Sequence, residues 1–193
     1  GDVGAQALGE ALKTNDSLTS LELYYNQIGD EGAKGLGESL KTNNALALIK
    51  LRNNHQIGDE GAKGFGESLK TNNTLTFLEL SSSNIGDIGA QALSEALKTN
   101  NALASLDLRS NQIVAKGGQA LGETLKKNNT LASLNLSSNW IRDAGAQALG
   151  EALMTNNALA SLDLCANQIG VSGAQALGKA LKTNNALTLL NLN

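Results

Sequence analysis

The sequence predicts a curved α/β solenoid, with a parallel sheet lining its concave side and helices lining its convex side. One unit recurs along the whole chain at a period of 28 residues. Within each unit, apolar residues first alternate as in a strand and then follow helical spacing. The chain contains no proline, the residue that lacks a backbone N–H and breaks helices and strands, so both elements can run without interruption. Because a fixed period of this length is typical of stacked repeats, we expect a right-handed horseshoe segment of about seven strand–helix units.

The copies follow one another without a linker. They begin at Leu18, Leu46, Leu75, Leu103, Leu131, Leu159 and Leu187. Stacked units share one continuous core, so we expect residues 1–193 to form a single domain. Gly1 aligns with Gly29, which places the start of the chain at a helix, whereas the last copy stops after its strand. Since both ends cut through a unit, we expect the chain to be a fragment of a longer protein.

Each unit opens with a short strand that has one buried face. Leu18, Leu21 and Leu23 show this spacing in the first copy, and the later copies repeat it. An Asn follows three residues after the last Leu in most copies. This column comprises Asn26, Asn54, Asn111, Asn139 and Asn167. A buried Asn can bond backbone groups freed as the chain leaves the strand, so we expect these side chains to stack as a ladder.

A Gly-containing turn and a helix complete the unit. Gly32 begins the helical stretch of the first copy, in which Ala33, Leu36 and Leu40 fall at helical spacing. The small residue at the Ala33 position lets the helix approach the strand closely. Neighbouring strands of a sheet lie about 4.8 Å apart, and helices are bulkier than strands. This mismatch should curve the stack.

Composition narrows the classes of function. Net charge is −3 with both signs interspersed, which argues against a nucleic-acid surface, and no apolar run is long enough to span a bilayer. His55 is the only histidine and Cys165 the only cysteine. We therefore expect no enzyme activity, no metal and no cofactor. The absence of a possible internal disulfide favours a cytoplasmic location, although N-x-[ST] sequons leave an extracellular one open. The sequons lie at Asn15, Asn72, Asn128 and Asn135.

The pattern L-x-x-L-x-L-x-x-N-x-I, followed by a G-x-x-G-A-x-x-L helix, resembles the leucine-rich repeat family. The period of 28 residues is similar to that of its ribonuclease-inhibitor-like class, and within it to the arrays of cytosolic NOD-like receptors. This resemblance implies a protein-binding module, and the receptor likeness implies ligand sensing of the innate-immune type. Three features depart from these relatives. Ribonuclease inhibitors are rich in cysteine and alternate two repeat types, whereas this chain has one repeat type and a single cysteine. The G-x-x-x-x-G-K-[ST] loop of a NOD-like receptor is missing, and so are atypical capping units.

Partner choice should depend on the concave positions where the copies differ. The first three strands bring together aromatic, basic and apolar residues with charged neighbours, whereas the later strands offer mainly Ser, Asn and Asp. The candidate residues are Tyr24, Tyr25, Leu48, Lys50, Arg52, Phe77 and Glu79, with Glu22 beside them. Tyr, Phe and Arg next to charged residues are typical of interaction hot spots. The alternative is sequence drift on an unused face.

Further candidates lie at irregular positions. The second unit has one extra residue near His55, and Ser83 replaces the ladder Asn in the third. These changes indicate either a reshaped loop beside the candidate residues or tolerated loop variation. Trp140 follows ladder residue Asn139 and would either anchor a partner or cover its own turn. Arg109 is a secondary candidate on the concave face.

Three functions fit these observations. The first is a protein-interaction module that senses or docks a protein partner. The second is a regulator of an enzyme, as in the ribonuclease-inhibitor-like and GTPase-activating branches that share this repeat. The third is a self-assembling array, because the last strand lacks a covering helix and could pair with a second copy. In that case Leu190 and Leu192 would form the edge of a homodimer.

Overall fold

The computed structural model describes all residues, from Gly1 to Asn193. Seven helices and seven strands alternate along the chain, beginning with a helix. The helices are α1 (Asp2–Leu12), α2 (Asp30–Ser39), α3 (Asp59–Leu69), α4 (Asp87–Leu97), α5 (Ala115–Leu125), α6 (Arg142–Leu153) and α7 (Val171–Leu181). The strands are β1 (Ser20–Glu22), β2 (Leu48–Lys50), β3 (Phe77–Glu79), β4 (Ser105–Asp107), β5 (Ser133–Asn135), β6 (Ser161–Asp163) and β7 (Leu189–Asn191).

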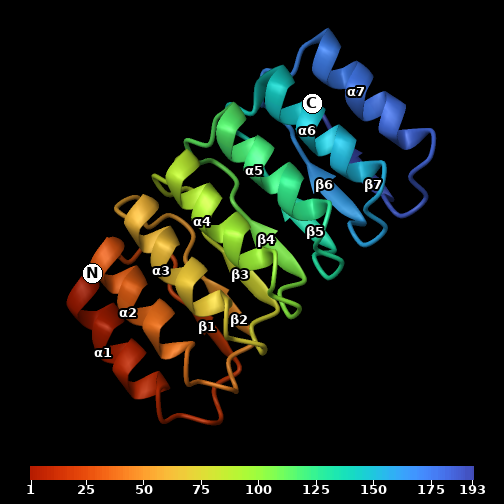
Figure 1. The fold of residues 1–193 in the computed structure, drawn as a ribbon. Helices are drawn as coiled ribbons and strands as arrows, with labels where there is room; N and C mark the ends of the chain where they lie inside the picture. The colour runs from red at the N-terminus through yellow and green to blue at the C-terminus, as the bar shows by residue number, and fades with distance from the viewer.

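The strands form one parallel sheet in chain order, from β1 to β7. The helices lie beside one another in a second layer, and α1 and α7 occupy opposite ends of the stack (Figure 1). This arrangement confirms the predicted α/β solenoid. No helix combines the length and apolar character that a membrane crossing requires.

The core lies between the two layers and runs the full length of the stack. Its buried apolar residues belong to one cluster, built from the strand Leu column, the Ile that follows each strand, and the Ala and Leu faces of the helices. Leu46, Leu75 and Leu103 are buried as leading residues of their units, whereas Leu18 at the outer face of the first unit is exposed. End units are covered on one side only, and this accounts for the difference.

The predicted Asn ladder is confirmed. Asn54 accepts hydrogen bonds from the backbone N–H groups of Asn26 and Ile28, and its side-chain amide donates to the carbonyls of Leu23 and Leu51. Asn111, Asn139 and Asn167 make the corresponding bonds in later units. Each side chain therefore ties its own turn to the preceding unit. Asn26 has no unit before it and is exposed.

A second row of buried Asn lies at the opposite edge of the sheet, where each helix turns back to the next strand. Asn100 donates to the carbonyls of Leu69 and Asn72 at 2.8 Å and accepts from the N–H groups of Ala102 and Leu103. The row comprises Asn43, Asn72, Asn100, Asn128, Asn156 and Asn184. The sequence pattern alone did not predict this row. Because two of its sequons, at Asn72 and Asn128, are buried and fully bonded, the folded chain does not present them for modification.

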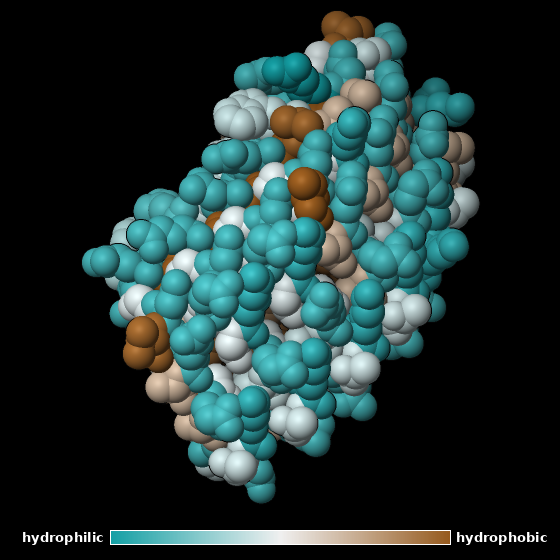
Figure 2. Space-filling view, turned by 60° about the vertical axis from the view of Figure 1, so that its left-hand side comes forward, coloured by the Kyte–Doolittle hydropathy of each residue, from teal (hydrophilic) through white to brown (hydrophobic).

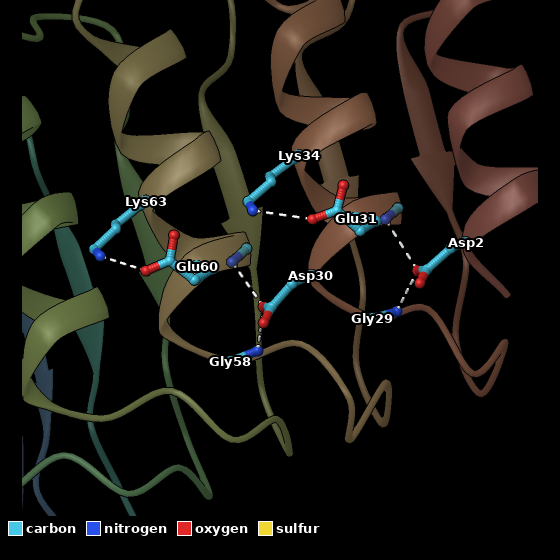
Figure 3. A network of polar contacts seen from close by, with 10 residues as sticks. Asp2, Gly29, Asp30, Glu31, Lys34, Gly58, Glu60 and Lys63 are labelled. Carbon is cyan, nitrogen blue, oxygen red and sulfur yellow. Dashed lines mark hydrogen bonds and ion pairs between the residues drawn. The ribbon is translucent and has the colours of Figure 1, made fainter.

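A row of Asp side chains joins successive helices at their N-termini. Asp2 accepts hydrogen bonds from the N–H groups of Gly29 and Gly32, and Asp30 accepts them from Gly58 and Gly61 in the next unit (Figure 3). Asp59, Asp87 and Asp143 repeat the arrangement. Each carboxylate thus caps the helix of the following unit, where the helix dipole favours negative charge. For this reason α2 begins at Asp30 rather than at the expected Gly32.

Candidate protein-interaction surface

The sheet register places the candidate residues of the first three strands side by side. Leu48 lies opposite Phe77, and Lys50 lies opposite Glu79. The residues between them, Ile49 and Leu78, point into the core, so the candidates face the concave side because side chains alternate along a strand. We define the concave patch as Tyr24, Tyr25, Leu48, Lys50, Arg52, Phe77 and Glu79.

Two residues of the patch are exposed, four are half-buried and Glu79 is buried. Tyr25 is 71% exposed and Arg52 is also exposed, whereas Tyr24, Leu48 and Phe77 are half-buried. None of these side chains belongs to the hydrophobic core. The surface therefore offers rings and aliphatic carbon at the first three strands. The face drawn in Figure 2 is mostly hydrophilic, with hydrophobic residues in small, separate spots.

Lys50 is held in place by its neighbours. Its Nζ donates a hydrogen bond to Glu22 Oε1 at 2.9 Å, and it lies 5.9 Å from the centre of the Phe77 ring. The hydrogen bond to Glu22 raises the pKa of Lys50 above its usual range. An ammonium at this distance from an aromatic face gains a cation–π attraction. The charge of Lys50 is thus already matched within the patch.

The position of Glu79 differs from the expectation that it is a charged residue beside the rings of the patch. Its side chain is not a solvated rim carboxylate, since the residue is only 8% exposed and accepts a hydrogen bond from the Ser81 hydroxyl at 3.0 Å. The sheet register places it between Lys50 and Asp107. Glu79 therefore forms part of the floor of the patch.

Arg52 differs from the other charged residues of the patch. It is exposed, and its guanidinium has no carboxylate within ion-pair distance. Only its backbone carbonyl is bonded, by the N–H of Tyr25 at 3.2 Å. The patch therefore carries one cation whose charge is not matched by a neighbouring side chain.

A pocket of about 310 Å³ opens at the edge of the patch. Its lining consists of Tyr25, Gln27, Asn53, His55 and Gln56. Tyr25 and Asn53 have left-handed backbone conformations, with φ of 56° and 60°, and these occur where the chain turns away from the sheet. Sequence analysis did not identify Gln27, Asn53 or Gln56. The feature of the sequence that could have indicated this pocket was the extra residue near His55.

The extra residue and the missing ladder Asn compensate for each other. In regular units the Ile N–H donates to the ladder Asn of the next unit, as Ile85 does to Asn111. In the third unit Ser83 replaces the ladder Asn, and its shorter side chain does not bond the Ile57 N–H of the unit before it. That N–H donates instead to the backbone carbonyl of Asn54 at 3.0 Å. The turn from 52 to 57 therefore closes on itself. This gives it a course different from the other turns, at the place where the pocket lies.

The secondary candidates lie away from the concave patch. Trp140 is 44% exposed on the turn after β5, two strands beyond β3. Arg109 is half-buried, and its N–H donates to Asp107 Oδ1 at 2.8 Å. Leu190 is half-buried and Leu192 exposed at the free edge of β7. No three His, Cys, Asp or Glu side chains come together as metal ligands would.

Several solved structures share the fold. A leiomodin-1 structure described as actin-binding site 2 superposes with a TM-score of 0.64 at 22% identity, covering 80% of this chain and 88% of that one. The tropomodulin C-terminal domain of Caenorhabditis elegans gives 0.59 at 13% identity, covering 93% and 92%. An internalin from Listeria monocytogenes gives 0.56 at 21% identity, covering 97% of this chain and half of the internalin.

Sequence comparison places the chain in a family. No curated protein matches it over its sequence. The family described as "Leucine Rich repeat" matches six segments, which together span most of the chain. They are residues 14–37, 46–66, 71–94, 99–122, 127–150 and 155–178. These segments follow the period seen in the sheet and in the three polar rows, and the chain belongs to the leucine-rich repeat family.

Proposed function

We propose that this chain is a protein-binding scaffold and that the concave patch is the surface that binds the partner. The observation that carries the proposal is that the first three units bring together the rings of Tyr24, Tyr25 and Phe77 with the exposed Arg52, whose charge has no ion-pair partner. At the same positions β4 to β6 carry Ser105, Ser133 and Ser161 in place of Phe77. Aromatic side chains and Arg at the centre of a patch are the residues that contribute most to protein binding.

Finer assignments belong to the same proposal. A location in the cytoplasm and a docking or sensing role of the NOD-like type fit a single repeat type with one free cysteine, Cys165. The proposed activity is binding rather than catalysis, without a cofactor, nucleic acid or membrane as ligand. Solved relatives that include an actin-binding site support protein binding as a use of this fold, and at their identity the likeness concerns the fold alone. The proposed partner class is therefore simply protein.

Selection from a random peptide library tests this proposal. The comparison variant is Tyr24→Ser/Arg52→Ser/Phe77→Ser, which gives the first strands the Ser found at these positions in later units and should keep the fold. We expect peptides enriched on the unchanged chain to bind it at least tenfold more tightly than the variant. Lys34→Gln, on helix α2 and outside the concave face, is the control and should bind normally. Equal binding by the triple variant would contradict the proposal.

A second candidate function is self-association through the last strand. β7 pairs with β6 only, and its outer edge has unpaired backbone groups next to exposed Leu189 and Leu192. Light scattering over a dilution series checks this. A dimer that disappears in Leu190→Glu/Leu192→Glu, with the helical circular-dichroism signal kept, would support it. A monomer at every concentration would contradict self-association through β7 and would have no bearing on the proposed role of the concave patch.

A further inference from the structure

The two ends of the stack expose the two halves of one unit. Helix α1 has no strand beneath it, and strand β7 has no helix over it. Four leucines whose counterparts in the interior units are buried are each between 40% and 45% exposed. They are Leu8 and Leu18 at the α1 end, and Leu181 and Leu192 at the β7 end. Each end therefore leaves the core open on one side.

The missing strand at the α1 end leaves a pocket of about 250 Å³. Its lining includes Ala5 and Leu8 of α1 and Leu23 and Ile28 of the first unit. In the interior units a strand lies beneath the helix, and its Leu side chains belong to the common core. Leu192 of β7 stands in the same column as Leu23. Strand β7 of a second copy therefore carries the kind of side chain that this end of the core lacks.

The backbone edges at the two ends also match. Within the chain, the Leu23 N–H donates to the Lys50 carbonyl at 2.9 Å, and the Leu48 N–H donates to the Thr19 carbonyl at 3.1 Å. The equivalent groups at the outer edges of the sheet have no partner. They are the Leu192 N–H and the Thr188 carbonyl on the β7 side, and the Ser20 N–H and the Glu22 carbonyl on the β1 side. Parallel pairing of β7 with β1 of a second copy would join them in the register used within the chain.

The charges at the two ends favour the same contact. Six helices carry Glu at one exposed position near their C-terminal end, whereas α7 carries Lys179 there. Lys182 follows at the end of α7, and this helix contains no acidic residue. At the other end of the stack α1 carries Glu10, which pairs with Lys13 and remains exposed. The exposed side of α7 is therefore basic, and α1 offers it a carboxylate.

Neighbouring helices inside the stack show how these charges would meet. Lys126 of α5 lies 3.4 Å from Glu151 of α6. Lys182 of α7 and Glu10 of α1 hold the same places in their helices, so they would approach each other in the same way. The capping Asp row does not continue, because Val171 stands at the position that Asp occupies in five other helices. We therefore expect a joint between two copies to be weaker than the joints within the chain.

We propose that β7 of one copy docks under α1 and beside β1 of a second copy, so that the chain associates head to tail. The second copy supplies the helix that covers β7, and the first copy supplies the strand that lies beneath α1. The inference rests on the second candidate function and specifies the surface that the last strand meets. Because the two docking surfaces differ, every added copy leaves one of each free, and the assembly grows beyond a dimer.

Light scattering with two end-blocked variants tests head-to-tail docking. Leu8→Glu/Leu18→Glu blocks the α1 end and Leu181→Glu/Leu192→Glu blocks the β7 end, and all four side chains are exposed in the single chain. We expect the unchanged chain to exceed the mass of a dimer as its concentration rises. Each variant alone should stay monomeric, and an equimolar mixture of the two should stop at a dimer. Val3→Glu, at another exposed position of α1, is the matched control and should associate like the unchanged chain.

A charge variant, Lys179→Glu/Lys182→Glu, provides a second test that changes only exposed side chains. It should keep the circular-dichroism signal and weaken association by about fivefold, because attraction to Glu10 becomes repulsion. Unchanged association of this variant, a dimer that never grows, or a dimer that persists when only the α1 end is blocked would overturn head-to-tail docking. The last two results would still leave self-association through β7. A monomer at every concentration would overturn both, and none of these results bears on the concave patch.

Discussion

Asn111 shows at the residue scale how one side chain holds two units together. Its amide donates to the carbonyls of Leu80 and Leu108 at 2.9 and 3.0 Å, and its Oδ1 accepts from the Ile85 N–H at 3.0 Å. We expect Asn111→Ala to lower the free energy of unfolding by about 1–3 kcal/mol, because buried backbone groups lose their partners. Urea denaturation measures this. Asn26→Ala, in the same column but exposed, should cost much less, and equal losses would contradict the ladder.

Asp107 gives a pH-dependent prediction at the same scale. Burial raises the pKa of its carboxyl, so folding disfavours the ionised form. In the next unit Asn135 occupies this position and accepts the equivalent N–H, that of Ser137, at 3.0 Å. We therefore expect Asp107→Asn to raise the melting temperature at pH 7.

The advantage of Asp107→Asn should shrink as the pH falls from 7 through the raised pKa of the folded state, and it should vanish below about 4, where Asp is protonated in both the folded and unfolded states. Melting curves between pH 3 and 7 check the trend. The reverse variant, Asn135→Asp, should lower stability at pH 7 and recover on acidification. A gap between Asp107→Asn and the unchanged chain that stays constant over this range would show that the carboxyl does not cause the effect.

At the scale of the element, helix spacing depends on which glycines face a neighbour. A Cβ at Gly66 of α3 would lie 2.8 Å from the carbonyl oxygen of Ala92 in α4, whereas a Cβ at Gly178 of α7 meets nothing within 4 Å. Gly66→Ala should destabilise the chain by about 1–3 kcal/mol through overpacking. Gly178→Ala should stabilise it by up to about 1 kcal/mol, because Ala favours helix. Thermal unfolding measures both, and the same sign for the two would contradict this packing.

The strands and helices could be predicted because the 28-residue period places Leu and Ala at fixed faces, and every unit repeats the same evidence. The residues at which the helices start were harder to predict from the sequence. The role of Asp30 depends on a contact with the following unit, at Gly58 and Gly61, and a single unit read alone does not contain it. The second Asn row was missed for the same reason, since Asn100 bonds residues 28 and 31 positions earlier in the chain.

The candidate site could be predicted only in part from the sequence. Alternation along a strand was sufficient to place Tyr24, Arg52 and Phe77 on the concave side. It did not indicate that Glu79 would be buried and hydrogen-bonded to Ser81. Nor did it reveal the pocket, which arises because the Ile57 N–H bonds within its own turn. Such effects depend on how two irregular units meet.

At the scale of the whole molecule, a regular scaffold carries an irregular surface at one end. The three polar rows and the common core are repeated from unit to unit, and they fix the stack without specifying a partner. The rings of Tyr24, Tyr25 and Phe77, the unmatched Arg52 and the pocket all lie in the first three units, at the strands or on the turns that follow them. This separation lets the scaffold keep its stability while the concave patch varies, and function in this fold depends on such sites rather than on the fold itself.

Hydrogen exchange of the chain with its tightest library-selected peptide tests most directly whether the concave patch is the binding surface. Amide exchange is followed by mass spectrometry with and without the peptide. We predict slower exchange in β1, β2, β3 and the turn from 52 to 57, with helices α4 to α7 unchanged. Protection confined to β5–β7 or to the convex helices would contradict the account, because the partner would then bind away from Tyr24, Tyr25, Phe77 and Arg52.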